Sequence, residues 1–189
     1  MFSVVVATAP APVISLAEAK QHLKVSHSAE DALIEGMVAA ATQTIDGPEG
    51  WLGRAVGVQT LEARFSLLFD RPSLRLPYPP VVELLTVRYL DRSGAERSAD
   101  PADFDLYGDA VSPAGSTWPW EGASFRPDAG RITYRAGYDT LPAPIRVAIL
   151  LMVGDLYRNR ESTAAVAMSK VPMSTNVEAL LSPFRVYTL

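Results

Sequence analysis

The fold is decided by ISLAEAKQHLKV (residues 14–25) and DALIEGMVAAATQTI (residues 31–45), together with LPAPIRVAILLMVGDLYRNRES (residues 141–162). Ser15 and Glu18 have the spacing of a capping box and predict a short helix over about residues 16–25. A second helix is expected to begin near Ser28 and to end at Gly47-Pro48. Its apolar residues cover a wide arc, which is typical of a helix packed on more than one side.

The third segment predicts a long helix that begins near Pro142 or Pro144, because proline is tolerated in the first turn. Its longest apolar run, from Val147 to Gly154, is far shorter than the roughly 20 residues that span a bilayer. We therefore expect a buried core helix. The tail that follows predicts a further short helix around residues 177–181.

The middle of the chain has the period-two alternation of β-strands. Apolar side chains alternate over residues 61–69, VVELLTVRYL (residues 81–90) is rich in β-branched residues, and two more short strands are expected at 104–107 and 131–135. Between the last two lies PAGSTWPWEGASFRPDAG (residues 113–130), which predicts a long loop or hairpin tip. Short strands joined by turns favour a small antiparallel sheet.

These patterns predict one α+β domain over residues 1–189: a helical bundle with a small antiparallel β insertion. The bundle combines the two N-terminal helices with the long C-terminal helix. The predicted parts are an extended N-terminal arm (1–14), helices (15–47), the β-rich insertion (56–137), a long helix (141–161) and a C-terminal docking tail (162–189). The apolar arm from Phe2 to Val6 lacks the basic start of a signal peptide, and it could add to the edge of a neighbour's sheet.

Composition excludes several classes of function. The chain has no cysteine, so disulfides and thiolate metal sites are excluded, and two histidines are too few for a histidine-rich metal centre. The net charge of −4 argues against a protein whose main task is to grip nucleic acid. Asp103 and Asp105 would share one strand face, but no nucleophile, histidine or phosphate loop accompanies them. We predict no catalytic, cofactor or metal residues.

Two clusters allow more than one interpretation. Trp118 and Trp120 could pack on the sheet, anchor a subunit interface, or stack against a ligand such as a sugar, and packing is the first of these in our ranking. Arg158, Arg160 and Glu161 lie at the end of the long helix. The arginines there oppose the negative end of the helix dipole, or they join an ion pair between subunits.

The order of these segments resembles the phage head–tail connector family, which includes gp6-like connectors, phage gp8-family proteins and the adaptor of gene transfer agents. The resemblance covers nearly the whole chain, and residues 111–128 depart most from it. It rests on LAEAK with HLKV (16–20, 22–25), DALI (31–34), LP with PPV (76–77, 79–81), Val87 with Tyr89 and Asp91, ITYRAGY (132–138), Pro142 with Pro144-Ile145, YRNRE (157–161), and Val177 to Arg185.

The resemblance implies a structural virion protein and no enzyme. Such adaptors form a ring of copies on the portal, twelve-fold where the ring matches the portal, and DNA passes through the centre without specific binding. The implied partners are the portal protein, a stopper or tail-completion protein and other copies of this chain, with no cofactor and no membrane. The protein would be made in the bacterial cytoplasm and located in the virion neck. The residues expected at contacts are Arg158, Arg160, Glu161, Leu180, Leu181, Phe184, Arg185, Tyr187, Trp118 and Trp120.

Two alternatives stay open from the sequence. The chain could be another neck component, such as a stopper or tail-completion protein. It could also be a small carbohydrate-binding module that uses Trp118 and Trp120 together with Tyr107.

Overall fold

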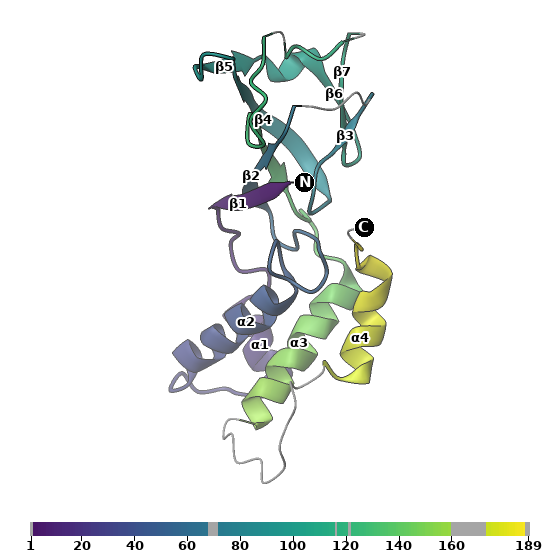
Figure 1. The fold of residues 1–189 in the computed structure, drawn as a ribbon. Helices are drawn as coiled ribbons and strands as arrows, with labels where there is room; N and C mark the ends of the chain where they lie inside the picture. The colour runs from purple at the N-terminus through teal and green to yellow at the C-terminus, as the bar shows by residue number, and fades with distance from the viewer. Residues whose placement is uncertain (1, 68–71, 116, 121, 160–172, 188–189) are drawn as a thin grey trace, which may run out of the picture. The chain divides into compact units, whose positions relative to one another are not determined.

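The computed structural model describes residues 2–67, 72–115, 117–120, 122–159 and 173–187. The chain divides into two compact units. The sheet unit comprises Met1–Ala11 and Gly57–Asp139, and the helical unit comprises Pro12–Val56 and Thr140–Leu189. Strands gather in the first and helices in the second, so the predicted α+β class is confirmed (Figure 1).

The sheet unit contains two antiparallel sheets, where the sequence predicted one small antiparallel sheet. A five-stranded sheet has the order β1-β2-β8-β4-β5, and a three-stranded sheet has the order β3-β7-β6. A single 3₁₀ turn, η1 (Pro101–Asp103), precedes β6. The strands are β1 (Ser3–Thr8), β2 (Gln59–Phe65), β3 (Leu74–Arg75), β4 (Val81–Leu90), β5 (Glu96–Ala99), β6 (Phe104–Tyr107), β7 (Ala110–Pro113) and β8 (Gly130–Ala136).

The two central strands of the larger sheet give this unit its core. Every second residue of β2 and β8 is buried, as period-two alternation requires when one face of a sheet is covered. Leu61 pairs across the strands with Tyr134, and both are completely buried. The hydroxyl of Tyr134 donates a 2.6 Å hydrogen bond to the carbonyl oxygen of Pro77, and burial raises the pKa of this phenol.

The helical unit contains α1 (Leu16–Leu23), α2 (Asp31–Ile45), α3 (Ala143–Arg158), α4 (Thr175–Leu181) and the 3₁₀ turn η2 (Ser182–Phe184). Helix α3 packs against α1, α2 and α4. Its buried face carries Ile145, Ile149 and Val153 at helical spacing. Apolar burial between the helices therefore stabilises this unit.

Polar contacts tie the N-terminal helices to α3 at the edge of this core. The Nη1 atom of Arg146 lies 2.8 Å from the Oε2 atom of Glu18, and the hydroxyl of Tyr157 donates a 2.6 Å hydrogen bond to Glu30. Because both contacts link segments more than 120 residues apart, they fix the register of the helices against one another.

Some local predictions differ from the structure. Helix α2 begins at Asp31, and Glu30 precedes it without a side-chain cap, so Ser28 does not cap this helix as predicted. Asp103 lies in η1 whereas Asp105 lies in β6, so the two carboxylates do not share one strand. The turn at Asp100, whose side chain accepts the amide of Ala102, interrupts the extended backbone there.

The boundaries of the predicted parts also change. The N-terminal arm is a strand in its own chain: β1 pairs with β2 from Ser3 to Thr8. The long helix expected at 141–161 covers Ala143–Arg158, and Arg160 and Glu161 lie outside the described residues.

Candidate interaction surfaces

The C-terminal residues lie against a loop of their own helical unit. The guanidinium carbon of Arg185 lies 4.2 Å from the ring centroid of Trp51 and 4.9 Å from that of Tyr187, so the cation is held between two aromatic rings. The amide of Val186 donates a 2.8 Å hydrogen bond to the carbonyl oxygen of Leu52. We call this arrangement, comprising Trp51–Arg54 and Phe184–Tyr187, the C-terminal clamp.

Two further contacts hold the C-terminal clamp closed. The Nε–H of Arg54 donates to the carbonyl oxygen of Phe184. Gly53 has a φ of +62°, and a Cβ atom built there would stand 2.8 Å from the carbonyl oxygen of Val186. A residue with a side chain would therefore be both strained and too close, so glycine is required where the two segments meet.

The expected contact residues of the tail differ in accessibility. Leu181 is completely buried within the helical unit, and Leu180, Phe184 and Arg185 are half-buried. Tyr187, by contrast, is 69% exposed. Of this part of the predicted site, Tyr187 is thus the side chain with the most surface to offer a partner.

Arg158 is the described member of the cluster at the end of the long helix. It is exposed in the last turn of α3, and the chain leaves the helix through a hydrogen bond from the Asn159 amide to the Asp155 carbonyl. Its position agrees with both interpretations, compensation of the helix dipole and contact with another chain.

The two tryptophans of the predicted loop pack against each other and against the sheet unit. The rings of Trp118 and Trp120 are stacked, with centroids 5.6 Å apart and planes at 10°. Trp120 also lies 5.9 Å from Phe104 and 5.5 Å from Tyr89, measured between ring centroids. Both indoles are half-buried. Sheet packing, the first of the three interpretations, is what the structure shows, and a role at a subunit interface stays a prediction.

An arginine row crosses the polar face of the five-stranded sheet, and sequence reasoning missed it. Arg64, Arg131 and Arg88 occupy opposite positions on β2, β8 and β4. Like charges in register repel one another, so this arrangement needs compensation from acidic residues. The alternation of the strands reveals the polar face in the sequence, but only the register aligns the three arginines.

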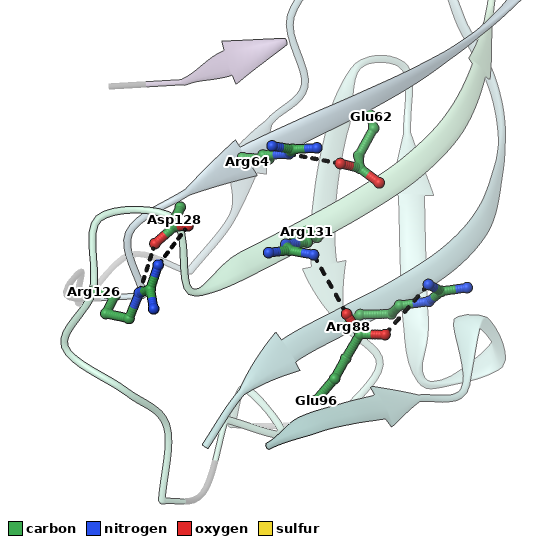
Figure 2. Close-up of polar contacts among 7 residues, drawn as sticks. All are labelled: Glu62, Arg64, Arg88, Glu96, Arg126, Asp128 and Arg131. Atoms are coloured by element: carbon green, nitrogen blue, oxygen red, sulfur yellow. Dashed lines mark hydrogen bonds and ion pairs between the residues drawn. The ribbon is translucent and has the colours of Figure 1, made fainter. Parts of the chain in front are cut away.

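Carboxylates placed around the row supply that compensation (Figure 2). Glu96 on β5 lies 3.3 Å from Nη1 of Arg88 and 3.5 Å from Nη1 of Arg131, so one carboxylate serves two guanidinium groups. Glu62 pairs with Arg64 at 2.7 Å along the same strand. The face is therefore a network of paired charges.

A separate ion pair lies near the start of β8. The guanidinium of Arg126 makes two hydrogen bonds to the carboxylate of Asp128, at 3.1 and 3.2 Å, and it lowers the pKa of that carboxyl (Figure 2).

An apolar groove lies between two helices of the helical unit. The backbone at Gly36 leaves it open, since a Cβ built there would meet nothing within 4 Å. Leu33 on α2 and Leu156 on α3 are both exposed at its rim. The groove is lined by Ala32, Leu33, Gly36, Met37 and Ala40 together with Leu156 and Asn159.

The described residues offer no arrangement for metal chemistry or for crossing a bilayer. Within the ranges given above, no three His, Asp or Glu side chains are grouped so that they could hold a metal ion. Nor does any helix in those ranges have the length and apolar character that a membrane span needs.

Comparison with known proteins shows which proteins this chain is similar to. Residues 13–102 match the family model of the phage gp6-like head-tail connector proteins. The predicted resemblance to head–tail connectors is confirmed. No curated protein matches the chain in sequence.

Solved structures with a similar fold include chains of gene transfer agent (GTA) particles. A chain in the virion of a native GTA particle aligns with a TM-score of 0.75 and 23% identity, over 98% of this chain and 96% of that one. A chain in the neck of an empty GTA particle computed with C6 symmetry aligns with a TM-score of 0.73 and 23% identity, over 99% and 97%.

A third chain, from the neck of a native GTA particle computed with C12 symmetry, aligns with a TM-score of 0.69 and 21% identity, over 99% and 97%. The whole connector-like chain, including the sheet unit beyond residue 102, thus shares its fold with chains of these particles.

Proposed function

We propose that this protein is a structural component of a virion neck, a head–tail connector. In this role copies of the chain form a ring on the portal and offer the attachment surface for the next neck or tail protein. DNA passes through the centre of the ring. The proposal is carried by the fold shared with chains of GTA particles over nearly the whole length, together with the family match over residues 13–102.

The surfaces of the chain are consistent with a role in assembly. A ring of identical copies needs a heterologous interface, in which one patch meets a different patch on the neighbour. The helical unit exposes an apolar groove between α2 and α3, and Tyr187 extends from the C-terminal clamp. Aromatic side chains and apolar grooves of this kind are common at protein interfaces.

A mildly acidic chain also suits a channel through which DNA moves. The net charge of −4 repels phosphate, and the arginine row already has carboxylate partners in Glu62 and Glu96. Retention of DNA through its phosphates needs clustered cations that are not already paired with carboxylates. We therefore infer passage of the genome without a binding site for it.

The test is electron microscopy of particles from cells that lack this gene. Filled heads beside free tails are the expected result, and the wild-type gene supplied in trans restores joined particles. Normal tailed particles from the deletion strain would overturn the proposal. Free tails with unfilled or leaking heads would instead favour a stopper over a connector on the portal.

A further inference from the structure

Strand β1 is joined to the sheet unit in an unusual way. It is the edge strand of the larger sheet, and among the described residues it pairs with β2 alone, antiparallel, from Ser3 opposite Arg64 to Thr8 opposite Thr60, with a shift in register between Val6 and Thr8. Val5 and Val6 point to opposite faces of the strand and are 46% and 40% exposed. Little besides the β2 ladder therefore holds this segment in place.

One aromatic contact anchors the start of the strand. The ring of Phe2 lies 5.6 Å from that of Phe65, the buried last residue of β2, measured between centroids. The segment FSVVVAT, residues 2–8, has no charge and no proline. Natural edge strands usually carry such residues to prevent pairing with other chains, so from Phe2 to Val6 this segment lacks that protection, and the register shift of the β1–β2 pair comes after it, between Val6 and Thr8.

The connection from β1 to the helical unit is short and contains proline. Residues 9–15 link β1 to α1 and include Pro10 and Pro12. The helical unit begins at Pro12, and Ile14 is buried, so residues 9–11 form the connection between the two units. At roughly 3.3 Å per residue, this connection spans about 10 Å when extended. Exchange therefore needs the β2 edge of the neighbouring copy to lie within that reach.

We propose that in the assembled ring β1 is exchanged between neighbouring copies, so that residues 2–8 of one copy pair with β2 of the next. The inference rests on the ring proposed above. The strand would keep its register and its Phe2–Phe65 contact, because β2 is the same surface in every copy. Exchange of an identical element joins protomers without any new complementary surface.

Exchange in one direction also provides what ring closure needs. Each copy gives one strand and receives one, which is a heterologous contact. Copies held side by side on a portal present each strand with a high effective concentration of the neighbouring β2. The strand that pairs with β2 therefore comes from a second copy of this chain. Pairing of β2 with a strand of another neck protein is the alternative that the test below detects.

Paired cysteines can distinguish exchange from pairing within one chain. The chain has no natural cysteine, so an introduced pair supplies the only thiols of this chain. Val5 lies opposite Glu62, and Val4 lies opposite Ala63. Neighbouring opposite pairs alternate between Cα separations of about 4.5 and 5.5 Å, so the double variants Val5→Cys/Glu62→Cys and Val4→Cys/Ala63→Cys sample both geometries.

Particles assembled with each double variant are purified, oxidised, denatured and separated on a non-reducing gel. Exchange predicts a ladder of covalently linked copies that collapses to monomer on reduction. The matched control is Glu62→Cys/Thr133→Cys, an opposite pair on β2 and β8 inside the sheet unit, which should close a disulfide only within one chain.

The remaining outcomes are all informative. A monomer with a closed β1–β2 disulfide, or free thiols in both pairs, would overturn the exchange. A link to a different neck protein, seen by mass spectrometry, would also overturn it. Absence of the chain from purified particles would contradict the proposed function, so the failure of the two proposals can be told apart.

Discussion

Arg185 shows how a single side chain can hold a terminal segment. Its guanidinium lies between the rings of Trp51 and Tyr187, while the backbone on both sides bonds to the loop that carries Trp51. The side chain therefore links the end of the chain to the segment after α2. Without it, the hydrogen bonds of the C-terminal clamp would be open to competition from water.

We expect Arg185→Ala to lower the free energy of unfolding by about 1 kcal/mol, the usual size of a partly covered cation–π contact. Hydrogen exchange at the Val186 amide should become faster, because this amide bonds to Leu52. Urea denaturation measures the first effect. Arg75→Ala is the control, because the side chain of Arg75 is 81% exposed. Equal stability of the two variants would contradict the role given to Arg185.

Asp91 organises the turn after β4. Its carboxylate accepts hydrogen bonds from the hydroxyl and amide of Ser93, from the Arg97 Nε–H and from the Ala95 amide. These donors, with the Ser93 hydroxyl and Arg97 first, lower the pKa of Asp91 from 3.8 to about 2. A lowered folded-state pKa favours folding above pH 3.8, and that contribution is lost as the pH falls toward 2.

Replacing the two side-chain donors should therefore raise this pKa. In the double variant Ser93→Ala/Arg97→Ala, NMR titration of the Asp91 carboxyl carbon is expected to show a midpoint moved from about 2 toward 3.8. For Asp91→Asn, the difference in melting temperature from wild type should shrink between pH 4 and pH 2. A difference in melting temperature that stays constant with pH would argue that the hydrogen bonds of the Asp91 turn are not the source of the difference.

Among the secondary-structure elements, α2 and β8 contain glycines with opposite roles. Gly36 lies inside α2, where a Cβ would meet nothing within 4 Å of the rest of the described chain. Gly130 begins β8, where a Cβ would lie 2.7 Å from the ring of Phe65. The first glycine weakens its helix without serving any contact in the described chain, whereas the second makes room for a buried ring.

Alanine at these two positions should change stability in opposite directions. Gly36→Ala is expected to raise the free energy of unfolding by about 0.5–1 kcal/mol through helix propensity. Gly130→Ala is expected to lower it by about 1–3 kcal/mol, because the ring of Phe65 would have to move within a packed core. Denaturant unfolding of both variants and of wild type measures the two changes in stability. Destabilisation by both substitutions would contradict the open space that the structure shows beside Gly36.

The sequence predicts helices and strands better than it predicts which residues from different elements lie side by side. The capping box identifies α1, the apolar period identifies α2 and α3, and β4 and β6 coincide with the expected strands, because these signals are local. The arginine row was invisible, since Arg64, Arg131 and Arg88 become neighbours only through strand register. The C-terminal clamp was missed for the same reason: Trp51 and Arg185 are far apart in the sequence.

For the whole molecule, the tail must be tested without unfolding the chain. Removing residues 171–189 would delete α4 and the buried side chains of Val177 and Leu181. Each buried aliphatic side chain contributes about 1.5–3 kcal/mol to the free energy of unfolding. Such a deletion would therefore impair folding as well as docking, and the two effects could not be separated. A substitution at an exposed position separates the two.

Tyr187→Ala is expected to leave the melting temperature within a few degrees of wild type and to reduce head–tail joining at least tenfold, counted as tailed particles in micrographs. The physical reason is loss of an exposed aromatic anchor at the portal or neck contact. Tyr107→Ala is the matched control, because Tyr107 is 70% exposed in the sheet unit and Tyr187 is 69% exposed. Equal joining by both variants would remove Tyr187 from the contact.

The close approach at Gly137 has an evolutionary consequence. A Cβ at this residue, whose φ is +123°, would stand 2.2 Å from the carbonyl oxygen of Gly57, so the backbone that enters residues 57–139 nearly touches the backbone that leaves them. A segment with adjoining ends can be enlarged, reduced or replaced by a short loop while the flanking helices keep their connection. The length of this segment can thus change between related proteins while the helical unit keeps its connections.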